Sequence, residues 1–130
     1  MEIITVVVII GVMAAFAIPN YTASIERAHQ RDATNNLIAV HAVNSIFRTE
    51  NGDTWPAGGV WEDLAAINSN LRLSIIANGM EYRCRKPGLL IGQYTCEACR
   101  PNCTTSTFKL TLNETPIVDK INPACSGACP

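Results

Sequence analysis

Residues 2–21 read EIITVVVIIGVMAAFAIPNY, and they differ sharply in composition from the rest of the chain. Only Thr5 and Gly11 interrupt the apolar run that extends from Ile3 to Ile18. A helix that spans a bilayer needs ~20 apolar residues, whereas a run of ~10–14 indicates a core helix or a signal segment. The run is nearly long enough to cross a bilayer. Nothing in the sequence is large enough to cover it, so it needs lipid or other copies of itself.

A cleaved signal peptide is the alternative interpretation of this run. Such peptides begin with a basic segment and close on a small-x-small cleavage site. Here no basic residue precedes the run, and it continues through Pro19-Asn20-Tyr21 into a second helical pattern. These features favour a retained helix.

The second pattern extends from Ser24 to about Thr49, where apolar residues recur at steps of three and four. They are Ala33, Leu37, Val40, Val43 and Phe47. This spacing predicts an amphipathic helix with one buried stripe. Joined to the apolar run, it predicts a rod roughly 70 Å long at ~1.5 Å per residue. Only the second half of this rod can pack on the chain's own head.

The remaining sequence predicts a loop, a short helix and a small sheet. Asn51-Gly52-Asp53 and the Trp-Pro-Ala-Gly-Gly run after it are helix breakers. A short helix is expected within 60–70, strands at 80–86, 89–96 and 107–113, and mostly loop from there to the last residue. The predicted fold class is α+β: a long N-terminal α-helix, hydrophobic in its first half and amphipathic in its second, packed on a small antiparallel β-sheet with a disulfide-rich C-terminal region.

We expect two parts. A hydrophobic transmembrane and polymerisation helix occupies 1–23, and a globular head occupies 24–130. The head is divided into the amphipathic helix 24–50, a loop at 51–79, and a β-sheet and cysteine-rich region at 80–130.

All six cysteines lie in the C-terminal part: Cys84, Cys96, Cys99, Cys103, Cys125 and Cys129. An even number of cysteines in a segment with little apolar material predicts a disulfide framework formed outside the cytoplasm. The Cys-Glu-Ala-Cys spacing also resembles a zinc knuckle, but the last two cysteines are spaced by three residues and both histidines belong to the long helix. Arg100 stands where haem attachment needs a histidine. We expect three intramolecular disulfides whose pairing stays open, with no metal and no cofactor.

Charge and polar residues give no sign of nucleic-acid binding or catalysis. The net charge is −1, so the chain lacks a field that would steer nucleic acid. We interpret the short basic run of Arg83, Arg85 and Lys86 as a solvated strand face. The carboxylates are scattered and the two helix histidines have no neighbouring nucleophile. The sequence therefore predicts a protein that is not an enzyme and has no catalytic residues.

Glu2, Gly11 and Pro19 carry a resemblance to a known family. The glycine follows the glutamate by nine residues, and the proline follows the glycine by eight. With these spacings the stretch closely resembles the N-terminal helix of type IV pilins and type II secretion pseudopilins. A lone acid in an apolar run is rare for any other reason. Beyond this stretch the chain agrees with the family only in architecture.

The resemblance implies assembly roles for these three residues. An ionised carboxylate in a membrane interior costs ~2.5–3.5 kcal/mol, and the implied partner of Glu2 is the N-terminal amine of a neighbouring subunit. The alternative places Glu2 among lipid headgroups. Gly11 and Pro19 weaken a helix by ~1 and ~3 kcal/mol relative to alanine. We expect the segment between them to unwind when lipid is exchanged for the filament core, and the alternative is a tolerated kink.

The start of the chain departs from the family pattern. The family's glutamate is normally the fifth mature residue, whereas only Met1 precedes Glu2 here. We expect three residues to be missing, together with the short basic leader that a prepilin peptidase removes. The mature N-terminal residue and its methylation stay open.

The resemblance implies a major structural pilin. Such a subunit waits in the bacterial inner membrane, is polymerised by pilus assembly machinery, and becomes part of a helical extracellular filament of identical subunits. Adhesion, motility or DNA uptake are the implied uses. One alternative is the major pseudopilin of a type II secretion system, and the six cysteines favour a pilin over it. A minor pilin at the filament tip is another. From a different class, a single-pass membrane-anchored binding protein needs an apolar helix but not the spacing of Glu2, Gly11 and Pro19.

Overall fold

The computed structural model describes residues 2–88, 90–100, 103, 108–115, 118–119 and 124–127. Within these ranges, the side chains at 2, 16–20, 23, 108, 114–115, 118–119 and 124–127 are not described.

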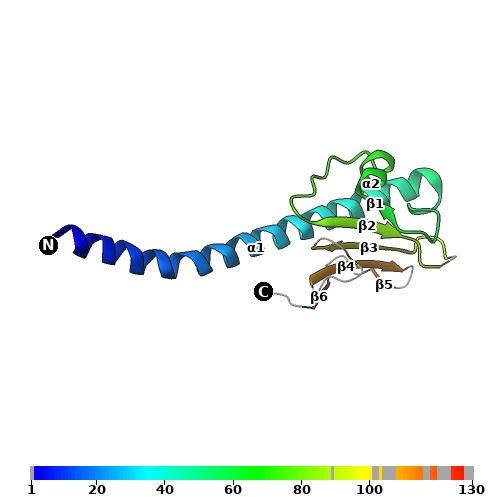
Figure 1. Cartoon of the computed structure of the whole chain (residues 1–130). Coiled ribbons are helices and arrows are strands. Elements are labelled where there is room, and N and C mark those ends of the chain that lie inside the picture. The colour runs from blue at the N-terminus through cyan, green and yellow to red at the C-terminus, as the bar shows by residue number, and fades with distance from the viewer. Residues whose placement is uncertain are drawn as a thin grey trace.

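A single helix, α1, runs from Glu2 to Asn51 as 50 consecutive helical residues. Figure 1 shows its first part extending away from the head and its second part lying against it. The helix ends where Gly52 adopts a φ of 79° and its N–H donates to the Arg48 carbonyl at 2.9 Å. A glycine with positive φ is the usual way to satisfy the last helical carbonyls. The long helix expected from the sequence is therefore present, and its helical backbone continues through Pro19.

Among the residues whose side chains are described, which leave out 16–20, no helix is long and apolar enough to cross a membrane. The transmembrane role of residues 1–23 stays a prediction.

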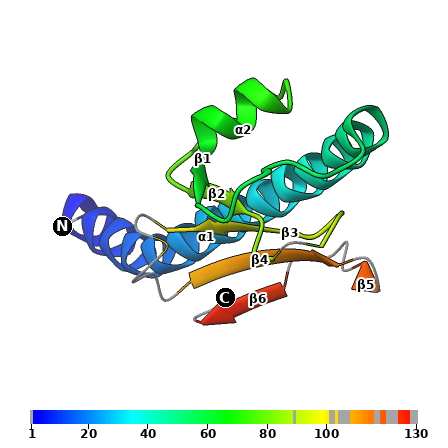
Figure 2. The same cartoon turned by 90° about the vertical axis from the view of Figure 1, so that its right-hand side faces the viewer.

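The head is built on an antiparallel sheet. Its strands are β1 (Glu62–Asp63), β2 (Glu81–Arg85), β3 (Tyr94–Cys99), β4 (Phe108–Thr115), β5 (Val118–Asp119) and β6 (Ala124–Gly127). The first five pair in sequence order, and β6 also pairs with β4. A short helix, α2, spans Leu64–Asn70 and is capped by the Asp63 carboxylate, which accepts from the Ala66 N–H at 2.9 Å. Figure 2 shows α1 crossing behind the sheet, with α2 beyond the edge formed by β1. The predicted α+β class is confirmed.

One strand prediction is wrong in its bounds, and the tail contains two strands that the sequence did not predict. The strand expected at 89–96 begins only at Tyr94, because the preceding residues form a turn in which the Gln93 N–H donates to the Leu90 carbonyl at 3.3 Å. The tail expected to be mostly loop contributes β5 and β6 in its described part. These strands pair through the backbone with β4. They are too short to show an alternation of apolar and polar residues in the sequence, so the sequence did not predict them.

The core lies between the second half of α1 and one face of the sheet. Ala33, Leu37 and Val40 are buried there, and Val43 and Phe47 pack against them as the periodicity predicted. The sheet contributes alternate residues, among them Tyr82, Tyr94 and Leu112. Both tyrosine hydroxyls reach polar partners on α1: Tyr82 accepts from Asn36 at 2.9 Å, and Tyr94 lies 2.7 Å from His41 Nδ1. Burial raises the pKa of Tyr82.

Asn44 is a polar residue within the buried stripe that the periodicity did not predict. Its side chain donates to the Trp55 carbonyl at 2.6 Å and accepts from the Trp55 N–H at 2.8 Å. A buried amide is stable only when such partners satisfy it. Asn44 thereby fixes the loop that leaves α1 against the helix.

Candidate functional site

The first part of α1 presents an apolar surface that the head does not cover. Every residue from Ile3 to Ala15 is exposed, including Ile3 at 81 % and Met13 at 69 %. Soluble monomers rarely leave so large a continuous apolar surface in water, and such surfaces mark sites of contact with membranes or other proteins. This surface is therefore the candidate assembly site.

The three residues expected to act in assembly lie on this helix, but the structure does not test their roles. Gly11 is exposed, and a Cβ added there would meet no atom within 4 Å. The fold of the single chain thus gives no packing reason for a glycine. The side chains of Glu2 and Pro19 lie outside the described residues, although the helical backbone passes through both.

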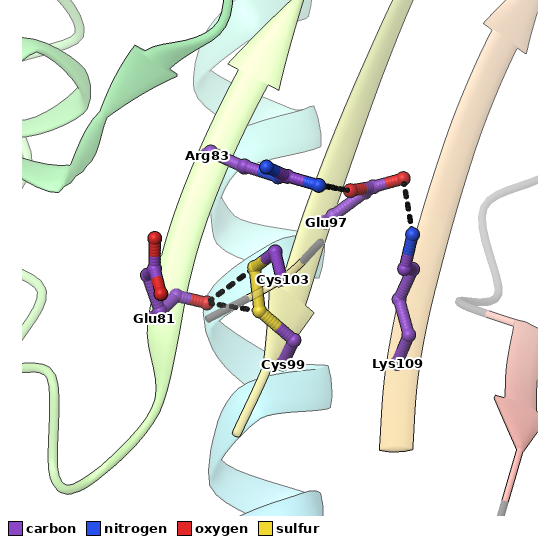
Figure 3. Close-up of a disulfide and its surroundings, with 6 residues drawn as sticks. All are labelled: Glu81, Arg83, Glu97, Cys99, Cys103 and Lys109. Atoms are coloured by element: carbon purple, nitrogen blue, oxygen red, sulfur yellow. Dashed lines mark hydrogen bonds and ion pairs between the residues drawn. A yellow bond between two sulfur atoms is a disulfide. The ribbon is translucent and has the colours of Figure 1, made fainter. Parts of the chain in front are cut away.

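Two disulfides are present among the described residues. Cys84 and Cys96 face each other across β2 and β3 in the buried core. Cys99 bonds to Cys103, on the sheet face turned away from α1, as Figure 3 shows. The predicted disulfide framework is confirmed to this extent. The remaining pair, Cys125 and Cys129, lies outside the residues with described side chains.

The resemblance of Cys96 and Cys99 to a metal knuckle is resolved by strand geometry. Side chains three residues apart in a strand point to opposite faces, so these two cysteines enter different disulfides. In the described part of the chain, the group with metal-ligand spacing comprises Glu81, Cys99 and Cys103. Both cysteines of that group are oxidised to a disulfide, so they offer no thiolate to a metal.

The basic run is engaged rather than solvated. Arg83 donates to Glu97 at 3.0 and 3.1 Å, and Lys109 reaches the other carboxylate oxygen at 3.3 Å; Figure 3 shows this row of side chains across three strands. The guanidinium carbons of Arg83 and Arg85 lie 4.3 and 4.5 Å from the centre of the Trp61 ring. The interpretation of the run as a solvated strand face is therefore wrong, because ring contacts and ion pairs cover these cations.

Asp53 joins the loop after α1 to the connection between β2 and β3. Its carboxylate accepts from the Thr54 N–H at 2.8 Å and the Gly92 N–H at 2.9 Å, and it forms an ion pair with Lys86. The hydrogen bond from Lys86, followed by that from Gly92, lowers the pKa of Asp53 to about 2. The sequence showed Asp53 only as a helix breaker, because Lys86 and Gly92 lie more than thirty residues away from it.

A second set of polar contacts holds the head to α1 where the helix leaves it. Arg100 forms a two-pronged ion pair with Glu26, with its Nε 3.2 Å from one carboxylate oxygen. Asn78 donates to Asp32 at 3.0 Å. The pKa of Arg100 is raised by its hydrogen bond with Glu26. These contacts fix the direction in which the exposed part of α1 projects.

Comparison with known proteins gives one informative match. A stretch of 51 residues is 31% identical to the type II secretion system core protein G of Vibrio cholerae serotype O1 (strain ATCC 39315 / El Tor Inaba N16961), covering 39% of this chain and 35% of that protein. The match thus spans about a third of the relative's own length. No family model matches the chain, and no solved structure matches it. The partial match agrees with the resemblance of residues 2–21 at the level of the pilin-like and type II secretion family.

Proposed function

We propose that this chain is the major structural subunit of a pilin-like extracellular filament. One observation carries the proposal: the side chains of Ile3–Ala15 are all exposed on a helix whose other end is anchored in a folded head. Such a helix is stable in water only if lipid or other copies of the chain cover it. The role is structural rather than catalytic.

In the proposed mechanism, the first part of α1 resides in the bacterial inner membrane before assembly and then moves into a bundle of identical helices. Different surfaces of successive copies meet in a heterologous contact, which generates an open helical polymer when the rotation does not close a ring. Shape alone gives such a bundle little axial register, because neighbouring turns of an apolar helix look alike. A charge pair between Glu2 and the amine of the next subunit supplies that register.

In the isolated chain α1 is continuous. In the filament we expect the residues between Gly11 and Pro19 to lose regular helical hydrogen bonds while Ser24–Thr49 stay helical. The unwound backbone must then be buried among protein, because unpaired groups facing lipid cost several kcal/mol each. Density for the assembled filament tests this expectation. A continuous helix through Met13–Pro19 in the filament contradicts it.

The experiment that tests the function is shearing of surface material from cells that express this chain. Negative-stain microscopy and mass spectrometry of the sheared fraction should find thin filaments in which this chain is the main component. A subunit that stays in the membrane fraction as a monomer, with no filaments, would instead indicate a membrane-anchored binding protein.

A second candidate, the major subunit of a type II secretion filament, is favoured by the match to the type II secretion system core protein G. Deletion of the gene separates the two. Loss of surface filaments with unchanged export of secreted proteins supports the pilus. Loss of secretion without loss of surface filaments supports the secretion system.

A further inference from the structure

Arg27 and Arg31 are two exposed arginines on α1, between the apolar first part of the helix and the half that packs on the head. They are four residues apart, so their side chains lie on the same face of the helix. Within the part of the chain that the structure describes, neither guanidinium has a hydrogen-bond or ion-pair partner. We call these two residues the basic pair.

The two carboxylates on the same part of α1 are turned toward the head. Glu26 forms its ion pair with Arg100, and Asp32 accepts from Asn78 at 3.0 Å. Because an α-helix has 3.6 residues per turn, Arg27 is turned about 100° around the helix from Glu26. Both carboxylates therefore have partners in the head, and the basic pair projects from another face of α1.

The basic pair lies near the depth of phospholipid headgroups if the first part of α1 spans the inner membrane. A hydrocarbon core of ~30 Å accommodates ~20 residues at ~1.5 Å per residue, so a span that begins at Ile3 ends near Thr22. Arg27 follows about 8 Å further along the helix, and Arg31 about 14 Å further. The headgroups add ~5–8 Å on each side of the core. Arg27 therefore lies at the outer edge of the headgroup layer, and Arg31 lies about one helical turn beyond it.

Both arginine side chains can reach back to the headgroup layer. Side chains on a helix lean toward its N-terminus, and Figure 1 shows that on α1 this direction leads away from the head, along the apolar part. Arginines near the ends of spanning helices extend to the interface in this way. Tyr21, which is 68 % exposed, falls at the boundary between hydrocarbon and headgroups, where tyrosines are enriched. The order of residues along α1 thus matches the layers of a membrane.

We propose that the basic pair binds the phosphate of an anionic phospholipid in the leaflet that the head faces. The inference rests on the proposed residence of the subunit in the membrane before assembly. A guanidinium donates two parallel hydrogen bonds to a phosphate, and a phosphate between the two side chains offsets the repulsion of like charges four residues apart. A lipid is favoured as the partner because the pair follows directly on the apolar run that the membrane covers. The contact holds the unassembled subunit at a fixed depth.

The test uses the full chain reconstituted in phosphatidylcholine vesicles that contain a trace of spin-labelled lipid. Electron paramagnetic resonance compares how strongly the chain immobilises spin-labelled phosphatidylglycerol and spin-labelled phosphatidylcholine. We expect the parent chain to prefer phosphatidylglycerol by about fivefold or more, and the double variant Arg27→Gln with Arg31→Gln to lose most of this preference. Arg72→Gln is the matched control. Arg72 is also exposed, but it lines a hollow with Glu50 in the last turn of α1, where salt screens its charge from the membrane, so this variant should keep the parental preference.

The outcomes separate the lipid contact from the proposed function. If the parent chain does not float with the vesicles, the proposed membrane residence fails and this inference fails with it. If the chain floats but shows no preference, or the double variant keeps the parental preference, the lipid contact alone is overturned. Loss of the preference when inorganic phosphate replaces chloride at equal ionic strength overturns the lipid as the partner and makes free phosphate the ligand. A double variant that keeps the lipid preference but loses surface filaments in cells assigns the basic pair to a contact between subunits instead.

Discussion

The two halves of α1 share one backbone conformation but have opposite surroundings. In the first half, Ile10 is 61 % exposed, and in the second half Leu37 is 1 % exposed. Both are large aliphatic residues in the same continuous helix. Most helical stability in proteins comes from packing of a face rather than from propensity. The second half is therefore stabilised by the head, and the first half depends on lipid or other subunits.

The largest effect we expect comes from the first half. Glu2→Ala should abolish or sharply reduce filaments when it is the only subunit expressed, while the subunit stays in the membrane and its head folds. Removing one partner of a buried charge pair typically costs ~3–5 kcal/mol, here for each subunit added. Glu50→Ala, at an exposed carboxylate at the other end of α1, is the control. Normal filament yield from Glu2→Ala contradicts the register mechanism, whereas loss from the membrane fraction would assign Glu2 to insertion or processing.

The second half can be compared directly with the first by truncating one buried and one exposed aliphatic residue. Leu37→Ala should destabilise the head by ~2–5 kcal/mol, because it leaves a cavity in the core. Ile10→Ala should change head stability by no more than ~0.5 kcal/mol. Urea unfolding of the detergent-solubilised full chain, followed by tryptophan fluorescence, measures both, since both tryptophans lie in the head. Equal destabilisation by the two variants would show that both halves of α1 contribute equally to the stability of the head.

Within the head, the two disulfides should differ in the same assay. Cys84–Cys96 closes a separation of 12 residues and Cys99–Cys103 closes a separation of 4. In the chain-entropy model these loops contribute ~3 and ~2 kcal/mol respectively. Replacing both cysteines of each pair by alanine should therefore lower stability more for the first pair. The reverse order would indicate that native packing, rather than the unfolded chain, determines the difference.

The smallest effect that we expect is a loss of head stability at low pH. The pKa of Asp53 is 3.8 in the unfolded chain and about 2 in the folded head. A carboxyl whose pKa is lowered on folding stabilises the protein above the unfolded value, and this contribution is lost as the pH falls through the folded value. Because the side chain is 37 % exposed, we reduce the contribution to about 1 kcal/mol for solvent screening. The urea concentration at the midpoint of unfolding should therefore decrease as the pH is lowered from 4 to 2. The variant Asp53→Asn should show a weaker dependence of this midpoint on pH.

Much of the fold was predictable because its signals are local. The run from Ile3 to Ile18 and the stripe through Leu37 and Val40 are periodic in the sequence, and they predicted both halves of α1. The β2 strand was found from the turns that flank it and β4 from alternation, both within one or two residues. The start of β3 was missed because Leu90 and Ile91 read as strand residues, whereas the turn at Gly92 depends on Asp53, far away in sequence.

The candidate assembly site was also predictable in outline. Exposure of the first half of α1 follows from an apolar run with no matching apolar surface in the rest of the chain.

The sequence by itself determined the long helix, its division into an uncovered and a covered half, and the presence of disulfides, because periodicity and composition act over neighbouring residues. The tertiary structure alone decided which cysteines pair, which carboxylate anchors which turn, and how Arg83 and Arg85 are covered by Trp61. These outcomes depend on strand register. A shift of β2 by one residue in register would turn Cys84 away from Cys96 and from the core, and it would separate the partners of the cross-strand contacts that β2 makes.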